Sequence, residues 1–513
     1  MTYTIQGKNN KYEVVIGCEI HAQVASHSKL FSRAPASFGA AQNSQVSLVD
    51  AALPGMLPVI NEECVKQAVK TGFGINAQIN LRSVFDRKNY FYADLPQGYQ
   101  ISQFLEPIVG EGSIEIDVAD FGNEENSGTK SNNPANQDGS RATSNMAKNY
   151  HKKTIRIERI HLEQDAGKSI HDQDPKCTLI DLNRCGVALM EIVSKPDMSS
   201  PAEAAEYVKQ IRAIVRALGT SDGDMEKGNL RCDANVSVRL VGASQLGTRC
   251  EIKNLNSMRN IARAIEFEAA RQVEIIEDGG VIRQETRLFD ALNGETRTMR
   301  SKEDAMDYRY FPDPDLPPLV LTQEFVDSIK ASLPELPDAK KMRYVRDYGI
   351  PEYDAGVLVF DSDISQYFET LIAKHEPKLS VTWLTVELFG RMNKLGINFE
   401  NLKVSAQQLS GLLDLIKDGS ISGKIAKDVL DFMIESGEEA AQIVEAKGFK
   451  QVSDSGAIEK IIDDVLAKNQ QSVDDFKAGK ERAFGFLIGQ IMKESKGQAN
   501  PSVVNELLRK KLG

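Results

Sequence analysis

Several features that would classify the chain at once are missing from its 513 residues. The six cysteines are scattered and form no C-x-x-C pair, which argues against a zinc ribbon and a disulfide framework, so we expect no zinc. No apolar run reaches the roughly 18 residues of a membrane helix, and the N-terminus has no signal or transit character. We therefore expect a cytoplasmic protein with no membrane partner.

The motifs of common nucleotide-binding and hydrolytic sites are also missing. Ala166-Gly-Lys-Ser169 resembles the end of a P-loop, but Leu162 stands where that motif needs its first glycine. Gly72-Phe-Gly74 lacks the third glycine of a dinucleotide fingerprint, and no G-x-S-x-G elbow is present. The net charge of −11 excludes a general polycation, so contacts with nucleic acid have to come from local basic patches.

The length and patterning of the chain predict three parts. Residues 1–294 contain recurrent short alternating or β-branched runs with a few helices, which is typical of an α+β fold with a mixed or antiparallel sheet. Residues 295–404 become mostly helical after a proline-rich stretch, and residues 405–513 are helical throughout.

Three segments of the first part have clear signals. Ser200-Pro201 is a typical helix start, which predicts a helix over 201–218, and apolar residues at helical spacing predict another over about 257–278. Residues 122–149 contain seven asparagines and no Val, Ile, Leu or aromatic residue. Such a segment buries too little apolar surface to offset its ordering entropy, so we expect a flexible insertion between two strands.

The strongest chemical signal is an alternation of polar and apolar residues in four segments. Residues 18–24, 160–165, 231–239 and 250–253 each place their polar side chains on one face of a strand. If these strands share one sheet, that face collects four carboxylates and an imidazole, flanked by basic residues. The acids and the imidazole are Glu19, His21, Glu163, Asp233 and Glu251, and the basic residues are Lys168, Arg231, Arg239 and Lys253.

This pattern has two interpretations. Converging carboxylates repel one another, and a divalent cation offsets the repulsion; oxygen-rich ligands favour Mg²⁺ or Mn²⁺ over Zn²⁺. Basic residues beside such a cluster suit phosphate groups, as in phosphoryl transfer. The alternative is a solvated sheet face, on which alternating charges are common. The sequence leaves both open because it does not show that the strands are neighbours.

Residues 85–103 interleave basic, aromatic and amide side chains, with Lys88 among them. This composition suits stacking on a base or sugar while cations hold phosphates. A helix-to-loop segment whose aromatic residues belong to the core fits the same composition equally well.

These segments also carry a resemblance that extends over nearly the whole chain. The chain resembles the B-subunit family of the aspartyl/glutamyl-tRNA(Asn/Gln) amidotransferases, the heterotrimeric GatCAB enzymes. The matching motifs are Val15–His21, Leu53–Pro58, Phe85–Gln103, His161–Lys168, Asp181–Arg184, Arg231–Ser237, Lys253–Ser257, Asp307–Pro312, Gly485–Gln490 and Lys496–Pro501.

The resemblance implies a fold and a reaction. It implies a cradle domain over 1–294 with a kinase and transamidase site, a helical domain over 295–404, and a YqeY-like helical tail over 405–513 that binds tRNA. The implied reaction is ATP-dependent amidation of misacylated Glu-tRNA(Gln), Asp-tRNA(Asn) or both. ATP phosphorylates the side-chain carboxylate, and ammonia then attacks the acyl phosphate.

The resemblance also implies partners. The family forms a heterotrimer in which an amidase, the A subunit, releases ammonia from glutamine and a small C subunit is the third member. The present chain has no amidase-type nucleophile signature and no cysteine beyond residue 250, which agrees with a division of labour. A non-catalytic tRNA-binding scaffold is the alternative, and such a scaffold has no need of a carboxylate-rich face.

Applied to this sequence, the resemblance suggests roles for three sets of residues, with ATP and Mg²⁺ or Mn²⁺ as cofactors. The expected metal ligands and catalytic residues are Glu19, His21, Glu163, Asp233 and Glu251. The candidates for contacts with ATP, phosphate and the substrate carboxylate are Lys88, Lys168, Arg231, Arg239 and Lys253. The expected tRNA-binding residues of the tail are Lys424, Lys427, Lys480, Lys493 and Lys496. Without the resemblance, an ordinary charged helical surface explains the tail lysines better.

Overall fold

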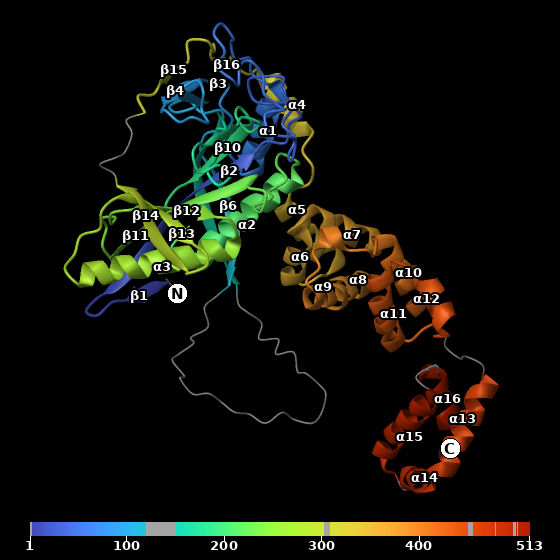
Figure 1. Cartoon of the computed structure of the whole chain (residues 1–513). Coiled ribbons are helices and arrows are strands. Elements are labelled where there is room, and N and C mark those ends of the chain that lie inside the picture. Colours follow the sequence, from blue (N-terminus) through green and yellow to red (C-terminus); the bar gives the residue numbers. More distant parts are fainter. Residues whose placement is uncertain are drawn as a thin grey trace. The chain divides into compact units, whose positions relative to one another are not determined.

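The computed structural model of the chain describes residues 3–119, 150–301, 308–449, 455–477, 479–495, 499 and 501–513. The chain divides into two compact units, Met1–Pro337 and Asp338–Gly513, which are coloured from blue to gold and from gold to red in Figure 1. The predicted insertion over 122–149 lies outside the described residues.

The first unit is built on a mixed sheet with nine strands among its described residues (Figure 1). The central strand is β2, and β1 pairs with its beginning. Strands β12 and β13 are parallel, whereas the other neighbours in the sheet are antiparallel. The order is β14 (Glu295–Ser301), β13 (Glu285–Asp290), β12 (Cys250–Leu255), β11 (Leu230–Leu240), β2 (Lys11–Gln23), β10 (Ala188–Ser194), β7 (Tyr150–Gln164) and β6 (Gly112–Ala119), with β1 at Thr4–Gln6. The predicted α+β fold with a mixed sheet is confirmed.

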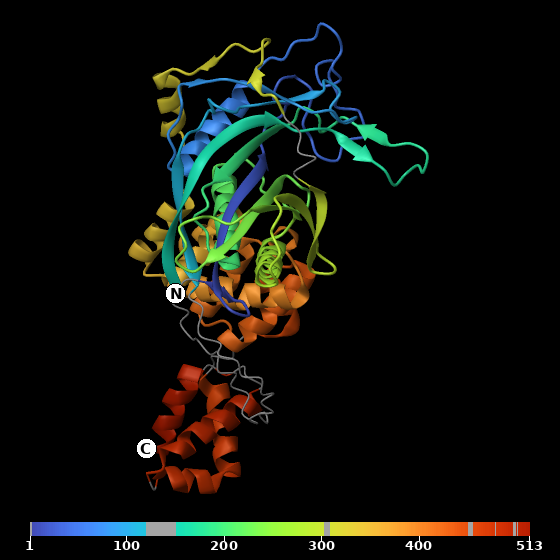
Figure 2. The same ribbon diagram turned by 90° about the vertical axis from the view of Figure 1, so that its left-hand side faces the viewer.

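The two faces of the sheet differ because side chains alternate along each strand. On β2, Val14, Ile16 and Ile20 are buried in the main apolar core. Helices α1 (Glu62–Gly74), α2 (Pro201–Ala217) and α3 (Met258–Glu277) pack on this side, and Figure 2 shows the long strands curving across the unit. Ser200 and Ser257 cap α2 and α3, which confirms both predicted helices. The opposite face is therefore left for polar residues.

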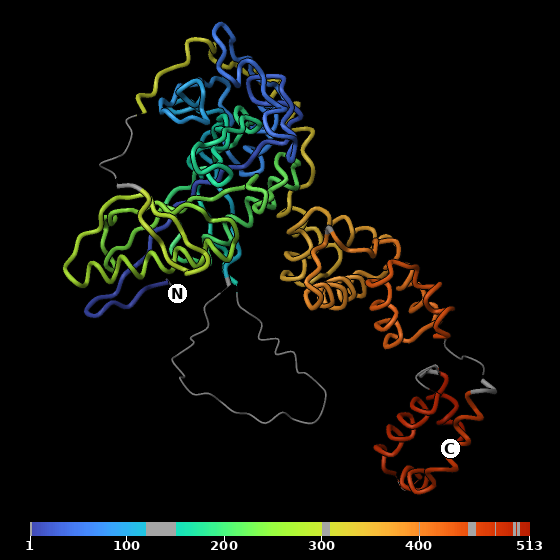
Figure 3. Tube along the Cα trace, in the orientation of Figure 1, coloured from blue at the N-terminus to red at the C-terminus, as the bar shows by residue number. Residues whose placement is uncertain are grey.

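Residues that follow the main sheet return to the first unit. Strand β15 (Phe311–Pro312) joins β4 (Asp86–Asn89) and β5 (Tyr99–Ser102), and β16 (Leu319–Val320) pairs with β3 (Arg82–Ser83). Helix α4 (Gln323–Ala331) packs on α1, and Figure 3 shows this gold segment beside the blue one. The first unit thus extends beyond residue 294, the boundary expected from the sequence. The expectation was wrong because strands of two residues are too short to show a periodic pattern.

The second unit is helical and contains two apolar cores. The first core runs from Tyr344 to Val444, so the expected boundary at residue 404 falls inside it. Helices α5 (Pro337–Tyr348), α6 (Glu352–Val359), α7 (Ser362–Ile372), α8 (Pro377–Val381), η2 (Thr382–Leu388), α9 (Phe389–Leu395), η3 (Phe399–Asn401), α10 (Ala406–Lys417), α11 (Gly423–Ser436) and α12 (Ala440–Lys447) lie along this stretch. The second core involves α13 (Ser455–Lys468), α14 (Gln470–Lys477), α15 (Glu481–Glu494) and α16 (Pro501–Leu512). Within the described residues, no helix has the length and apolarity that a membrane span requires.

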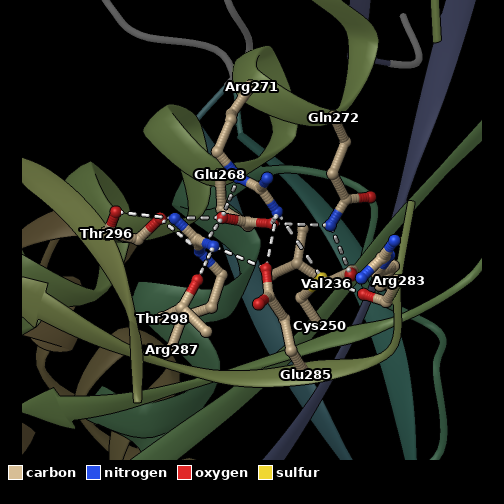
Figure 4. Close-up of polar contacts among 10 residues, drawn as sticks. All are labelled: Val236, Cys250, Glu268, Arg271, Gln272, Arg283, Glu285, Arg287, Thr296 and Thr298. Atoms are coloured by element: carbon tan, nitrogen blue, oxygen red, sulfur yellow. Dashed lines mark hydrogen bonds and ion pairs between the residues drawn. The ribbon is translucent and has the colours of Figure 1, made fainter. Parts of the chain in front are cut away.

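A buried polar cluster ties α3 to the edge of the sheet (Figure 4). The fully buried carboxylate of Glu268 accepts hydrogen bonds from Arg271 and Gln272 of the same helix and from the Thr296 hydroxyl of β14. Arg287 of β13 lies 3.1 Å from the same carboxylate. Burial alone would raise the pKa of Glu268, but the hydrogen bonds from Arg271, Gln272 and Thr296 outweigh it and lower that pKa.

Glu268→Gln should destabilise the first unit by about 3–5 kcal/mol at pH 7, because it removes the buried charge of the cluster and leaves Arg271 and Arg287 with only the Glu285 carboxylate. The folded-state pKa of Glu268 is lowered, so its contribution is full above the unfolded value of about 4.3. That contribution disappears as the pH falls through the folded value. Calorimetry of the full chain should show that the first unit of the variant has a lower free energy of unfolding than that of the wild type. This difference should become smaller as the pH falls toward 3.

The second unit provides an internal control for this comparison. The chain's single tryptophan, Trp383, is buried in the first core of the second unit. Its fluorescence transition should be the same in wild type and variant. Equal stability of the first unit in both proteins at pH 7 would contradict the role given to Glu268.

Candidate catalytic site

Strand register brings four polar residues into one row on the sheet face opposite the helices. His161 of β7 lies opposite Glu191 of β10, and Glu191 lies opposite His21 of β2. His21 in turn lies opposite Arg231 of β11. Directly paired residues point to the same face of a sheet, so these side chains form a ladder across four strands.

His21, Glu163 and Glu191 form a compact group on this face. One potential ligand atom from each lies within 4.8 Å of the other two. The Nε2 atom of His21 is 3.4 Å from the Glu191 carboxylate and 3.7 Å from the Glu163 carboxylate. His161 Nε2 approaches the same two carboxylates to 3.1 Å and 3.7 Å. The group is well shielded, since Glu163 is 3% exposed and His161 is 4% exposed.

Imidazoles and carboxylates compensate one another in this group. Burial lowers the pKa of each imidazole, but the nearby carboxylates outweigh burial and raise the pKa of His161 to about 9. The pKa of His21 is raised in the same way, chiefly by Glu191. Burial would raise the pKa of the carboxylates, yet pairing with His161 and His21 holds the pKa of Glu163 low and that of Glu191 well below its usual value.

This donor set fits a divalent cation. Two carboxylate oxygens and an imidazole nitrogen converge from three neighbouring strands, and the oxygen-rich set suits Mg²⁺ or Mn²⁺. His161 adds a second observation, because its buried Nδ1 has no hydrogen-bond partner among the described residues. A cation bound by the three ligands would replace the imidazole protons as the compensating positive charge.

Sequence reasoning missed one member of the compact group, Glu191, and its neighbour His161. Glu191 is the only charged residue of the apolar strand 188–194. Burying a charge costs free energy unless it is paired, so a single acid in such a strand indicates a functional or paired residue. His161 belongs to an alternating segment, but nothing in the sequence pairs it with Glu191. Only the β7–β10–β2 register makes both residues neighbours of His21.

Asp233 and Glu251 belong to a second group, centred on Lys253. The Lys253 ammonium forms ion pairs with both carboxylates, at 2.8 Å from Glu251. The Thr286 hydroxyl donates to Glu251 at 2.9 Å. Of the five expected metal ligands, the structure therefore brings only His21 and Glu163 into the compact group, because Asp233 and Glu251 are paired with Lys253 instead.

Glu19 lies between the two groups. It is opposite Asp233 in the register of β2 and β11, and its carboxylate accepts a hydrogen bond from Asn235 at 3.0 Å. Burial is the main cause that raises the pKa of Glu19, and the charges of Glu191, Glu251 and Asp233 add to it. At Glu19, the basic residues of this face therefore do not fully compensate the negative charge of the surrounding carboxylates.

Lys88 lies at the compact group, on a wall of aromatic residues. Burial opposes its charge, but the carboxylates of Glu163 and Glu191 outweigh burial and raise its pKa. Its ammonium is 5.0 Å from the centre of the Tyr308 ring and 6.0 Å from that of Tyr90. Lys88 is thus held as a cation beside the carboxylates.

The segment 85–103 satisfies both interpretations in part. Phe85 is a core residue at 2% exposure, whereas Phe91 is 80% exposed and Tyr92 is 55% exposed. The neighbouring Phe104 stacks on Tyr310, with ring centres 4.4 Å apart. An exposed aromatic surface therefore lies beside Lys88.

The other candidate basic residues lie apart from one another. Arg231 is 3.0 Å from Asp165 and ends the row that contains His21. Arg239 instead pairs with Glu13, and eight residues along β11 place it about 26 Å from Arg231, so it is not part of this group. Lys168 is exposed in β8 (Lys168–Ile170), which pairs with β9 (Leu179–Asp181) away from the main sheet.

The tail lysines are distributed over two helical cores. Lys424 is exposed on α11, where Lys427 pairs with Glu387 at 2.6 Å. Lys480 precedes α15 and pairs with Asp475 at 2.9 Å, and Lys493 is exposed near the end of α15. Lys496 lies outside the described residues.

The fold and the compact group define a catalytic domain of a known type. Residues 14–327 match the family model of the GatB/GatE catalytic domain, and residues 366–512 match that of the GatB domain with its YqeY-type tail. The first match contains every residue of the compact group.

Full-length relatives identify the family. The chain is 55% identical to the B subunit of the aspartyl/glutamyl-tRNA(Asn/Gln) amidotransferase of Pelagibacter ubique, over 99% of this chain and 98% of the relative. It is 54% identical to the counterpart from Rickettsia canadensis over the whole of both chains. The counterpart from Rhodopseudomonas palustris is 56% identical, over 99% of this chain and 98% of the relative. The chain belongs to the B-subunit family of the aspartyl/glutamyl-tRNA(Asn/Gln) amidotransferases, as the motifs suggested.

Loss of one carboxylate from the compact group should weaken cation binding. Glu191→Gln should lower the affinity of the full chain for Mn²⁺ by more than about 100-fold, because it removes a charged ligand. His161→Gln should lower it by about 10- to 100-fold, the usual effect of losing a group that orients a ligand. Electron paramagnetic resonance of free Mn²⁺ measures both affinities.

The matched control is Glu115→Gln, which changes an exposed acid on β6 that pairs with Lys152. It should leave Mn²⁺ affinity unchanged. Wild-type affinity in the Glu191→Gln protein would show that the compact group does not hold the cation.

Proposed function

We propose that this chain carries out ATP-dependent amidation of misacylated Glu-tRNA(Gln), Asp-tRNA(Asn) or both, as one subunit of a glutamine-hydrolysing amidotransferase. The observation that carries the proposal is the buried group of His21, Glu163 and Glu191 inside the matched catalytic domain. Relatives that share more than half of the residues are named for this activity, which supports the same substrate class.

The chemistry requires activation of a carboxylate. An ionised side-chain carboxylate repels nucleophiles and has no good leaving group, whereas an acyl phosphate accepts ammonia and releases phosphate. The γ-phosphoryl group of ATP is therefore transferred to a carboxylate oxygen, and attack by ammonia then breaks the acyl–oxygen bond. Mg²⁺ or Mn²⁺ held by His21, Glu163 and Glu191 would supply neutralisation of the triphosphate charge.

The chain's own side chains fit three parts of this reaction. Lys88 places a shielded ammonium beside the cluster, where it stabilises charge on the transferred phosphoryl group. Lys253, held by Asp233 and Glu251, is a second cation for phosphate or carboxylate oxygens. The Glu19 carboxylate, with its raised pKa, is suited to accept the proton that ammonia loses when the amide forms.

The proposed reaction needs partners. The chain has no amidase-type nucleophile signature, so an amidase, the A subunit, supplies ammonia, and a small C subunit is the third member of the heterotrimer. The relatives' designation as B subunits supports a multisubunit assembly. In this proposal the first unit forms the cradle with the catalytic site, and the helical second unit includes the tRNA-binding tail. Because the product would be aminoacyl-tRNA for translation, we expect the enzyme to act in the cytoplasm.

The exposed aromatic surface beside Lys88 supports binding of the acceptor end of the tRNA. Single-stranded nucleotides are recognised by stacking of bases on aromatic rings, and Phe91 and Tyr92 offer exposed rings. A scaffold without catalytic function is the second candidate. The compact group argues against it, because burying two carboxylates with two imidazoles serves no purpose in simple tRNA binding.

Glu163→Gln in the reconstituted heterotrimer should reduce amidation of misacylated tRNA by at least about 10²- to 10³-fold, the usual effect of removing a group that stabilises transition-state charge. Glutamine hydrolysis by the partner amidase should persist. Amide formation and glutamate release from labelled glutamine measure the two activities separately.

The control for this experiment is the wild-type chain without the partner amidase, which should form no amide from glutamine. Full amidation by the Glu163→Gln heterotrimer would favour the scaffold. Amidation by the isolated chain with glutamine as donor would contradict the division of labour.

Exposed tail lysines should contribute to tRNA affinity through phosphate contacts. Lys424→Ala and Lys493→Ala should each weaken tRNA binding and reduce the slope of log affinity against log salt by about 1. Filter binding of the full chain over a salt series measures both quantities. Lys330→Ala on α4 is the control, and an equal effect of all three variants would contradict a tRNA-binding tail.

A further inference from the structure

Asp165, which directly follows β7, is shared by two arginines. Its Oδ2 atom lies 3.0 Å from Nη2 of Arg231 on β11 and 3.4 Å from Nε of Arg184 in the connection between β9 and β10. Its other carboxylate oxygen, Oδ1, accepts the N–H of Ala166 at 3.0 Å. Only 7% of Asp165 is exposed, so the two guanidinium groups meet one shielded carboxylate.

Arg231 keeps a donor for a ligand. It stands opposite His21 in the register of β2 and β11, and its Nη2 donates to Asp165. The buried Nε of Arg231 has no hydrogen-bond partner within the described residues. A buried donor without a partner is costly, and a bound ligand is one way to satisfy it. The ligand that a guanidinium fits best is an oxyanion, either a carboxylate or a phosphate.

Arg184 fastens the turn that contains Asp165. Its Nε donates to the Ala166 carbonyl at 2.9 Å, and its Nη2 donates to the Gly167 carbonyl at 2.7 Å. The planar guanidinium presents its donors in a fixed fork, so these two contacts and the ion pair with Asp165 hold one another in place. Asp165 therefore has little freedom to turn away from Arg231.

The segment that carries Arg184 is itself anchored in the interior. Lys29 is fully buried, and its ammonium lies 2.9 Å from the Asp50 carboxylate and donates to the Leu182 carbonyl at 3.3 Å. The Cys185 thiol donates to the Asp50 carbonyl at 3.5 Å. A buried ion pair is strongly destabilised by the loss of either partner, so this anchor resists displacement. Arg184 thus extends from a segment that buried contacts hold on both sides.

We propose that Arg184 is a positioning residue for the amidation reaction. It holds Asp165 in place, and Asp165 in turn holds the Arg231 guanidinium at the end of the row that contains His21. There Arg231 binds an oxyanion of the substrates. The oxyanion is either the side-chain carboxylate of the aminoacyl group or a phosphate of ATP, because both have the same hydrogen-bonding chemistry. This inference rests on the proposed function, which supplies both substrates.

A second route leads from Arg184 to the exposed aromatic surface. The Gly167 N–H donates to the Asp94 carbonyl at 2.8 Å, and the Ser169 hydroxyl donates to the Asp94 carboxylate at 3.1 Å. Asp94 belongs to the loop that carries the exposed aromatic rings. The route through Asp165 is the more direct one, because Arg184 contacts the Asp165 carboxylate itself. The experiment has to separate the two routes.

A double-mutant cycle in the reconstituted heterotrimer tests the proposal. Arg184→Ala should lower kcat/KM for amidation by about 10- to 100-fold, the effect expected when a group of the site is misplaced. In a chain that already carries Arg231→Ala, the same change should lower it by less than about 2-fold, because Asp165 then has no partner to position. A purely structural role would lower kcat/KM by the same factor in both backgrounds.

Arg156→Ala is the matched control, because Arg156 is an arginine of β7 that pairs with a different acid, Asp197. It should leave amidation unchanged. The Arg184 side chain is 45% exposed, so its truncation leaves no buried cavity. Circular dichroism of the Arg184→Ala chain should therefore match that of the wild type at the assay temperature, and glutamine hydrolysis by the partner amidase should persist.

The kinetic constants of Arg184→Ala and Arg231→Ala identify the oxyanion. A raised KM for misacylated tRNA in both variants assigns the aminoacyl carboxylate, and a raised KM for ATP assigns a phosphate of bound ATP. A loss in kcat alone assigns the phosphoryl group during its transfer. Each of these results supports the proposal, provided that the two variants share it.

The outcomes also separate this inference from the function on which it rests. An equal loss from Arg184→Ala in both backgrounds is what the route through Asp94 predicts, and it would overturn the inference. Wild-type kinetics in Arg184→Ala or in Arg231→Ala would overturn it as well, while amidation by the wild-type heterotrimer upheld the function. If the wild-type heterotrimer formed no amide, or needed no ATP, the proposed function itself would fail.

Discussion

The structure of the first unit depends on compensation of charge on one face of a sheet. Two carboxylates, Glu163 and Glu191, are shielded from water, and this is tolerated because the imidazoles of His21 and His161 lie within 3.7 Å of them. The strand register fixes this arrangement. His161 and Glu163 belong to β7, Glu191 to the neighbouring β10, and His21 to β2 beyond it.

The same constraint explains why the acids of the face form two groups rather than one. Lys253 is paired with Asp233 and Glu251, and the two histidines face the two carboxylates of the compact group. Glu19 stands between them with a raised pKa, where neither set of positive charges fully reaches it. A negatively charged nucleotide is therefore compatible with the face only beside positive charge, at Lys88, at Lys253 and at a cation that the compact group would hold.

Much of this arrangement follows from the sequence, and the remainder has physical reasons. Alternation along residues 18–24 and 231–239 predicted the polar face, since period two fixes which side chains share a face. Glu191 was not predicted, because a single acid in an apolar strand forms no periodic pattern. Arg239 was wrongly grouped with the site residues, because alternation shows which face a residue lies on but not how far along the strand it is. The expected boundary at 294 lies before the end of the first unit. The reason is that β15 and β16 are two-residue strands whose partners lie more than 200 residues earlier in the chain.

Anomalous diffraction from the heterotrimer crystallised with Mn²⁺ and ATP tests the central claim most directly. The account predicts a manganese peak between the side chains of His21, Glu163 and Glu191, within coordination distance of all three. A peak held instead by Asp233 and Glu251, or nucleotide bound with no metal at the compact group, would contradict it.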